Sequence, residues 1–231
     1  MDNVLFKYFE HRYKSVIEKS DKHEKLGPVI TISRQSGCEA KKLTKVLVNK
    51  LNKHSRGKLW TVIDKEILEK SAKELNLSKS KIEHFYQGDD KSKFIDLFVA
   101  FSKTYVNEIQ IKNTIIDVIK SFCKQGHIIL MGRAGAAILQ DQPNVLNIRL
   151  TAPFAWRINT IMNNQKCSIE DAEEWAIDTD EKRYKLYHQF IEKHPSNIDY
   201  LFDATLNRKY FNIEQTADII IELAKIKDIY T

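Results

Sequence analysis

Residues 29–42 combine an apolar run with small, polar and cationic residues in an order that suits phosphate chemistry. The segment reads VITISRQSGCEAKK, which predicts a buried strand, a turn and the start of a helix. Backbone N–H groups at such a helix start can wrap phosphate oxygens, and nearby lysines offset the negative charge. We therefore predict a phosphate-binding turn here. The residues expected to contact a nucleotide are Ser33, Arg34, Gln35, Ser36, Gly37, Cys38, Glu39 and Ala40.

The turn departs from the usual pattern of nucleotide-phosphate loops, which is G-x-x-x-x-G-K-[ST]. In that pattern the glycines let the backbone approach phosphate, the lysine contacts it and the hydroxyl holds Mg²⁺. Ser36 and Gly37 fit the pattern. The two glycines and the lysine are replaced, in that order, by Arg34, Glu39 and Ala40, and a lysine stands in place of the hydroxyl residue. The sequence thus predicts the geometry of a phosphate site with altered chemistry.

Glu39 has two interpretations. Its carboxylate can repel a triphosphate, since two like charges about 4 Å apart cost roughly 1 kcal/mol in water and several times that near protein. Alternatively, Ser36 and Glu39 form an S-x-x-E capping box that satisfies the first N–H groups of the helix. Both interpretations favour weakened triphosphate binding. Lys41 and Lys42 argue the other way, because a shifted helix start would bring one of them to the phosphates, so both are candidate catalytic residues.

The three cysteines are Cys38, Cys123 and Cys167, and they are far apart, without C-x-x-C or paired His. Neither a disulfide framework nor a zinc site is expected from this spacing. Cys38 at a helix start either has a thiol pKa lowered by the helix dipole or is a small residue in place of serine. Reduced thiols, the lack of an apolar run of about 20 residues and the lack of a signal-peptide core predict a cytoplasmic protein without membrane association.

Three arginines could supply further positive charge to a phosphate site. Arg133 directly follows Gly132 and a predicted strand, Arg157 lies just past the next strand, and Arg183 lies in a late helical segment. Open α/β sheets bind ligands at the carboxyl ends of their strands. Phosphoryl transfer spreads negative charge over the transferred group, so convergent guanidinium groups suit it. Each arginine alone would be an ordinary surface residue, but together they predict an anion site.

Short apolar runs alternate with helical segments along the chain, which predicts an α/β fold with a parallel sheet covered on both faces. The predicted strands are Val29–Ser33, Leu59–Ile63, His127–Met131, Asn144–Leu150 and Tyr200–Thr205. Residues about 64–125 are expected to form a helical insertion, whose aromatic run at 94–105 either packs in the core or stacks a base. Residues 163–194 are expected to form a helical hairpin with a helix start at Ser168.

Residues 1–26 are expected to form an amphipathic helical extension that covers either the core or a partner subunit, which leaves a homodimer through this helix open. The net charge of +6 permits an anionic partner, although a lysine-rich surface explains it equally well. The sequence has no helix-turn-helix, zinc or aromatic RNA-binding signature. We therefore expect a nucleotide or small phosphorylated substrate rather than nucleic acid.

Six segments in this order resemble the cytidylate kinase-like branch of the P-loop nucleoside monophosphate kinases. They are VITISRQSG, VIDKEIL, ILMGRAGAAIL, NVLNIRLTAPFAWRI, SIEDAEEWAIDTDEKRYKLYH and DYLFDATLN. The resemblance implies a three-layer P-loop NTPase fold over residues 27–231, with an acceptor-site insertion at about 64–125 and a lid at about 157–194. It also implies transfer of a phosphoryl group from ATP, with Mg²⁺, to CMP, dCMP or another small acceptor.

The resemblance implies roles for particular residues outside the phosphate turn. It assigns Asp64, Gly132, Arg133 and Asp180 to substrate binding, and Arg157 and Arg183 to catalysis. The branch has an aspartate after its Gly-Arg pair, where this chain has Ala134. The sequence therefore predicts a phosphotransferase. The alternative is a catalytically impaired P-loop protein that binds a nucleotide or a partner protein, which the missing lysine and hydroxyl support.

Overall fold

The computed structural model describes residues 26–53, 57–64, 73, 108–191 and 197–230. Within these residues, five strands form one sheet in the order β2-β3-β1-β4-β5. Every neighbouring pair of strands is parallel, which confirms the predicted sheet. The strands are β1 Val29–Arg34, β2 Thr61–Ile63, β3 Ile128–Met131, β4 Val145–Thr151 and β5 Ala204–Asn207.

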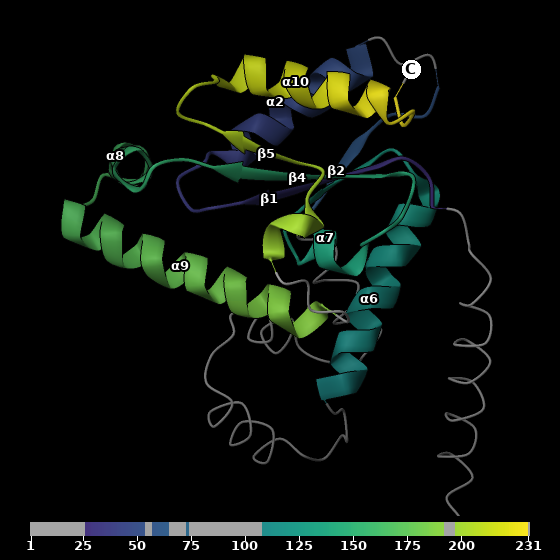
Figure 1. Cartoon of the computed structure of the whole chain (residues 1–231), viewed down its shortest axis with the longest axis horizontal. Helices are drawn as coiled ribbons and strands as arrows, with labels where there is room; N and C mark the ends of the chain where they lie inside the picture. The colour runs from purple at the N-terminus through teal and green to yellow at the C-terminus, as the bar shows by residue number, and fades with distance from the viewer. Residues whose placement is uncertain (1–25, 54–56, 65–72, 74–107, 192–196, 231) are drawn as a thin grey trace, which may run out of the picture.

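Helices lie on both faces of the sheet, so the fold has three layers (Figure 1). The helices α2 Ala40–Lys53 and α10 Ile213–Ile226 pack side by side on one face. The helices α6 Glu108–Gln125, α7 Gly135–Ile138 and α9 Ile169–Phe190 lie on the other face. The helix α8 Phe154–Gln165 lies at the carboxyl end of β4 and packs on α9.

The two faces of the sheet carry separate hydrophobic cores because successive side chains of a strand point to opposite sides. Ile30 and Ile32 of β1 pack with α2 and α10, and all three elements contribute fully buried residues to that core. Val29 of β1 and Leu130 of β3 pack with α6, α7 and α9 in the other core. This burial on both faces explains why the strands read as continuous apolar runs instead of alternating ones.

Two predicted starts differ from the structure by more than two residues. The predicted fifth strand began at Tyr200, but Ile198–Leu201 forms a 3₁₀ turn whose start is capped by Asn197, which accepts a hydrogen bond of 2.9 Å from the N–H of Asp199. The predicted hairpin began at residue 163, whereas α8 already begins at Phe154. The predicted helix start at Ser168 is confirmed, since its hydroxyl accepts from the N–H of Asp171 at 3.1 Å.

Several predictions concern residues outside the described ones. They are the N-terminal helix of residues 1–26 with its possible homodimer, most of the insertion at 64–125 with its aromatic run, and the last residues of the proposed lid at 157–194. The described end of the insertion is α6. Among the described residues, no helix is both long and apolar enough to cross a bilayer.

Candidate phosphate-binding site

The turn between β1 and α2 keeps the shape of a phosphate-binding loop. The N–H of Gln35 donates to the carbonyl of Leu150 at 3.0 Å, which holds the start of the turn against β4. Gly37 and Glu39 then adopt left-handed φ angles of +79° and +53°. A non-glycine residue in that region costs about 1–2 kcal/mol. Glu39 therefore occupies a backbone position that favours the glycine of the usual pattern.

Gly37 is also required for close packing against α8. A Cβ at this position would lie 2.6 Å from the carbonyl oxygen of Arg157 and 2.9 Å from its Cβ. These atoms belong to the backbone of α8 or lie next to it, so they could not move away without shifting the helix. Gly37 of the predicted phosphate turn thus lets α8 dock on the turn.

The predicted capping box between Ser36 and Glu39 is wrong. The hydroxyl of Ser36 donates to the carbonyl of Ala176 in α9 at 3.3 Å and accepts from Nη1 of Arg157 at 3.0 Å. Both partners lie more than 100 residues away in the sequence, which is why a local pattern does not reveal them. Ser36 therefore links the turn to α8 and α9 and does not cap α2.

The charge of Glu39 is offset by two cations. Its carboxylate lies 2.5 Å from Nζ of Lys42 and 3.9 Å from Nη2 of Arg208. The expected repulsion of a triphosphate is reduced, because these cations outnumber the carboxylate. Lys42 also donates to Oδ1 of Asn164 at 3.1 Å, so its ammonium group is already occupied. Lys41 is exposed and has no ion-pair partner within the described part of the chain, which leaves it as the available cation beside the turn.

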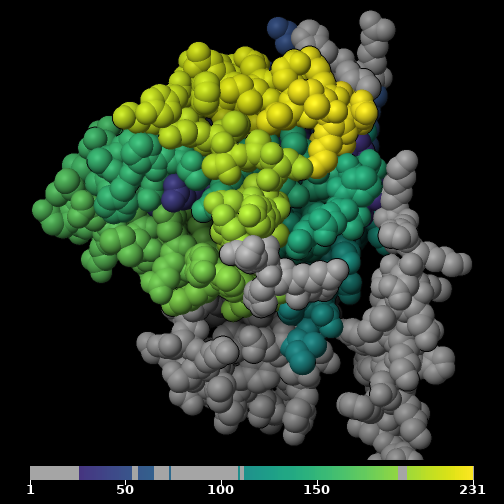
Figure 2. All heavy atoms as spheres, viewed as in Figure 1, coloured from purple at the N-terminus to yellow at the C-terminus, as the bar shows by residue number. Residues whose placement is uncertain are grey.

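The start of α2 offers backbone donors to an anion. The N–H groups of Gly37, Glu39, Ala40 and Lys41 donate to no oxygen of the residues that the structure describes. Unsatisfied N–H groups at a helix start, together with the helix dipole, favour negative charge. The turn reaches the surface as a small purple area between the green α8–α9 hairpin and the yellow-green segment that contains β5 (Figure 2).

A cavity of about 450 Å³ lies between this turn and the α8–α9 hairpin. It is lined by residues 34–42, by Ile161, Asn164 and Gln165 from α8, and by Trp175 and Arg183 from α9. The residues predicted from the turn thus lie together at one cavity, except Ser33, which is buried in β1. Of the two predicted arginines of the hairpin, Arg183 lines the cavity directly and Arg157 supports its wall.

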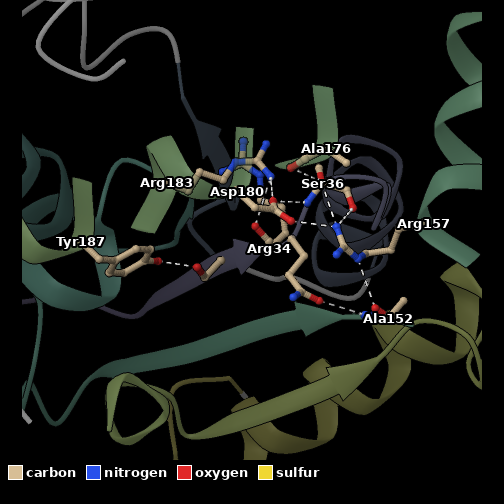
Figure 3. A network of polar contacts seen from close by, with 10 residues as sticks. Arg34, Ser36, Ala152, Arg157, Ala176, Asp180, Arg183 and Tyr187 are labelled. Atoms are coloured by element: carbon tan, nitrogen blue, oxygen red, sulfur yellow. Dashed lines mark hydrogen bonds and ion pairs between the residues drawn. The ribbon is translucent and has the colours of Figure 1, made fainter. Parts of the chain in front are cut away.

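Asp180 of α9 connects the turn to both arginines (Figure 3). Its Oδ1 accepts from the N–H of Ser36 at 2.7 Å and lies 3.4 Å from Nη1 of Arg183. Its Oδ2 accepts from Nη1 of Arg157 at 2.8 Å. Arg157 is only 6% exposed and also donates to the carbonyls of Ala152 and Ser36, each at 3.2 Å. The carboxylate of Asp180 therefore accepts from the N–H group of Ser36, which a loop of this shape would otherwise offer to phosphate.

Arg183 lies where burial and a neighbouring cation both disfavour its charge. Burial is the larger cause and the charge of Arg34 the next, and they lower the pKa of Arg183 to about 10 against the opposing effect of Asp180. The side chain is therefore still a cation at neutral pH. Its Nη1 donates to the carbonyl of Arg34 at 3.3 Å, so it bridges α9 and the end of β1. A bound anion would offset the unfavourable placement of this charge.

A second turn follows β3 at the same edge of the sheet. The N–H of Gly132 donates to the carbonyl of Ile32 in β1 at 3.0 Å, which confirms that the two turns lie at the same carboxyl-end edge. Gly132, Arg133 and Ala134 have consecutive φ angles of +74°, +57° and +54°. This strained turn places Nη2 of Arg133 3.2 Å from Oδ1 of Asp64, just past β2. Three of the four predicted substrate-binding residues therefore lie at this second turn, and the fourth, Asp180, lies at the first.

The interpretation of Cys38 as a thiol of lowered pKa is wrong. Cys38 is 1% exposed, and burial is the main reason that its pKa is raised to about 11. The helix start at Ala40 does not compensate for this burial. Cys38 is therefore a packing residue, as the alternative interpretation held.

Two residues near the site were missed from the sequence. Arg208 is 3% exposed, follows β5, and donates from its backbone N–H to the carbonyl of Thr151 at 2.8 Å. Its position directly after a strand is the signal that identified Arg133, so the same rule would have found it. Tyr187 of α9 shares a hydrogen bond between hydroxyl groups with Ser33, and burial raises its pKa. No local pattern indicates that contact.

The residues of the turn do not fit a protein-held Mg²⁺. The usual hydroxyl position, directly after Ala40, is Lys41, a cation. The nearby carboxylates of Glu39 and Asp180 are already paired with cations. Within the described residues, no group of three His, Cys, Asp or Glu side chains is placed to hold a metal ion. We therefore derive no step through a metal held by this turn.

Solved structures with a similar fold have low sequence identity to this chain. A crystal structure of an uncharacterized protein from Eubacterium ventriosum ATCC 27560 has a TM-score of 0.60 at 15% identity, over 86% of this chain and 98% of that chain. Shikimate kinase from Bacteroides thetaiotaomicron has a TM-score of 0.45 at 13% identity, over 86% and 98% of the two chains. Shikimate kinase from Acinetobacter baumannii in complex with shikimate has a TM-score of 0.46 at 11% identity, over 91% and 99%. The last two scores are too low to carry an argument.

The five-stranded parallel sheet, its covering helices and the turn after β1 define a three-layer P-loop NTPase fold. No curated protein matches the sequence. A model of the cytidylate kinase-like family matches residues 29–210. Because this match covers well over half of the chain, the protein belongs to the cytidylate kinase-like family.

Proposed function

We propose that the protein is a phosphotransferase that moves a phosphoryl group from a nucleoside triphosphate to a nucleoside monophosphate or another small acceptor. The observation that carries this proposal is the cavity of about 450 Å³ between the phosphate turn and the α8–α9 hairpin. Its turn side presents available N–H groups, and its hairpin side presents Arg183. Donors and cations on opposite walls suit a chain of phosphates.

The donor and the acceptor have separate places in this proposal. The triphosphate, ATP by family resemblance, lies on residues 37–41, where the N–H groups bind its oxygens and Lys41 offsets their charge. The acceptor lies at the second turn, where Arg133 is held by Asp64. Arg183 lies between the two places and stabilises the charge on the transferred group. The chemical contribution of the protein is positioning and electrostatic stabilisation, which is what phosphoryl transfer needs.

A second candidate function is nucleotide binding without turnover. It is favoured by the contact between Asp180 and the N–H of Ser36, which occupies a donor of the turn from within the protein. The carboxylate of Glu39 in the same turn adds to this argument, although Lys42 and Arg208 offset its charge. In this case the same cavity would hold a nucleotide, but no phosphoryl group would be transferred, because the usual lysine is missing from the turn.

Calorimetry and a coupled ADP assay test both candidates. ATP, GTP, CMP and dCMP are titrated with and without Mg²⁺, and ADP formation is followed with and without each monophosphate. We expect Lys41→Ala to weaken ATP binding about tenfold, the scale of one charge-assisted contact. Lys45→Ala is the matched control, because Lys45 is exposed on α2 and does not line the cavity.

The outcomes separate the candidates. ADP formation that requires a monophosphate supports the phosphotransferase. ATP binding without acceptor-dependent ADP formation selects the nucleotide-binding candidate. A wild-type protein that binds none of the four nucleotides contradicts both.

A further inference from the structure

Arg34 ends β1, and its side chain crosses to the neighbouring strand β3. A Cβ on Gly132 would lie 2.1 Å from Nη1 of Arg34 and 3.2 Å from its Cζ. The guanidinium group therefore rests on the bare Cα of Gly132. Gly132 has two reasons to be glycine, since its φ angle is +74° and any side chain would displace Arg34. The side chain of Arg34 is therefore directed towards the second turn, where the proposed function places the acceptor.

The charges around Arg34 come from three other elements. They are Asp64 after β2, Arg133 after β3, and Asp180, Arg183 and the hydroxyl of Tyr187 on α9. Burial is the main reason that the pKa of Arg34 is lowered, and Arg133 contributes in the same direction. Tyr187 is neutral at physiological pH because burial raises its pKa. Arg34 thus lies in a place that disfavours its charge unless an anion joins it.

The carboxylates near Arg34 already have other partners. Asp64 pairs with Arg133 at 3.2 Å, and Asp180 pairs with Arg157 at 2.8 Å and Arg183 at 3.4 Å. Among the residues that the structure describes, two carboxylates therefore serve four arginines, which leaves an excess of two positive charges. Among the described residues, no oxygen accepts a hydrogen bond from the guanidinium group of Arg34, and this side chain lines the cavity. Its donors are available to a ligand.

We propose that Arg34, with Arg133 and Arg183 beside it, binds the phosphate of a monophosphate acceptor as a dianion. This inference rests on the proposed function and names the acceptor class of the same site. A phosphate monoester carries about two negative charges above its second pKa, near 6, which matches the excess of positive charge. A guanidinium group can contact two phosphate oxygens at once. From its position in the phosphate turn, Arg34 would be expected to contact the triphosphate. The proposed contact is with the acceptor phosphate instead.

Two ligands and two variants separate the acceptor place from the donor place. CMP and Mg²⁺-free ATP are titrated calorimetrically into wild type, Arg34→Ala and Lys41→Ala. We expect Arg34→Ala to weaken CMP binding at least tenfold and ATP binding less than threefold, and Lys41→Ala to do the reverse. Arg34→Lys should restore CMP binding only in part, because an ammonium group keeps the charge but not the two-pronged contact. Arg149→Ala is the matched control, since Arg149 of β4 pairs with Asp199 of the 3₁₀ turn and does not line the cavity.

The pH dependence identifies the charge state of the bound phosphate. Wild-type affinity for CMP should rise about fourfold between pH 5.5 and 7.5, as the phosphate loses its second proton near pH 6. This rise should be reduced in Arg34→Ala and retained in Arg149→Ala. A structural role for Arg34 alone would not change the pH profile.

Each other outcome overturns the inference. Arg34→Ala that weakens ATP and leaves CMP unchanged would place Arg34 on the donor and leave the proposed function intact. Equal losses for both ligands, with a lowered melting temperature, would show a structural role. Wild-type protein that binds neither ligand would overturn the proposed function together with this inference.

Discussion

Glu39 shows at the residue scale how much the effect of one charge depends on its partners. From the sequence, its carboxylate is a source of repulsion in a phosphate turn. In the structure, Lys42 and Arg208 offset that charge, and the left-handed backbone at Glu39 preserves the shape of the turn. We therefore expect Glu39 to affect triphosphate binding mainly by occupying Lys42, so that replacing it releases that lysine as well as removing a carboxylate.

The double change Glu39→Gly, Ala40→Lys should tighten ATP binding about tenfold. It removes the carboxylate, relaxes the left-handed position and adds a cation where the usual pattern has its lysine. Full activity is not expected, because Lys41 still occupies the position of the Mg²⁺-binding hydroxyl. Calorimetry measures the affinity, and Glu39→Gln separates charge from backbone strain since it removes only the charge. ATP affinity that stays unchanged in all variants would show that the turn does not receive the triphosphate.

Gly132 makes a second residue-scale prediction. Gly132→Ala should lower the free energy of unfolding by about 1–2 kcal/mol, because alanine is disfavoured at a φ angle of +74°. It should also weaken CMP binding as Arg34→Ala does, since the new Cβ displaces the guanidinium group. Urea denaturation and calorimetry measure the two effects. Gly57→Ala is the control, with open space around its Cβ and an expected change within about 0.5 kcal/mol.

At the scale of elements, periodicity predicted what each segment forms, but not how the segments are tied together. The strands and the start of α9 at Ser168 could be predicted because a strand run or a helix cap is a local pattern. The start of β5 was misplaced because Asn197 caps a short 3₁₀ turn within an apolar segment. The role of Ser36 could not be predicted, since its partners Arg157 and Asp180 belong to α8 and α9. The sequence identified candidate site residues, but which of them contact one another depends on the tertiary structure.

Asp180→Asn tests the tie between α9 and the phosphate turn. Arg157 is nearly buried and would lose its carboxylate, a change that costs several kcal/mol for a fully buried pair. Asp180 is 25% exposed, so we expect a smaller loss of about 2 kcal/mol in the free energy of unfolding. Glu181→Gln is the control, because its pair with Lys185 is exposed and contributes about 0.5 kcal/mol or less. Equal stability of the two variants in urea would show that the network contributes nothing to the fold.

At the scale of the whole molecule, the parallel sheet brings residues that are distant in the sequence to one edge. The rule that ligands bind at the carboxyl ends of parallel strands predicted that the turns after β1 and β3 would lie at the same edge of the sheet. The strand order β2-β3-β1-β4-β5 is what makes them adjacent. That order could not be read from periodicity, because each strand is an equivalent apolar run. The two cores on either side of the sheet also place Cys38 and Cys123 in opposite layers, both 1% exposed.

These two buried thiols predict how the stability of the molecule depends on pH. Burial raises the pKa of Cys38 from 9.0 to about 11 and that of Cys123 from 9.0 to about 12. Between pH 8 and 10 the unfolded chain therefore releases thiol protons that the folded chain retains, so the unfolded state is favoured as pH rises. We expect the free energy of unfolding to fall by about 2–3 kcal/mol over this range. Above pH 10 the lowered pKa of Arg183, about 10, acts with the opposite sign and limits the range of the test.

Urea denaturation at pH 8, 9 and 10 measures this dependence, with the variants Cys38→Ala, Cys123→Ala and Cys167→Ala as the test set. Each of the first two should remove about half of the decrease, whatever its effect on stability at pH 8, because the removed thiol no longer titrates. Cys167→Ala is the control, since Cys167 is the least buried of the three, and it should leave the decrease unchanged. A decrease that persists in the double variant Cys38→Ala, Cys123→Ala would mean that other groups control alkaline unfolding. The pH dependence of the free energy of unfolding would then not support the interpretation of both cysteines as neutral packing residues.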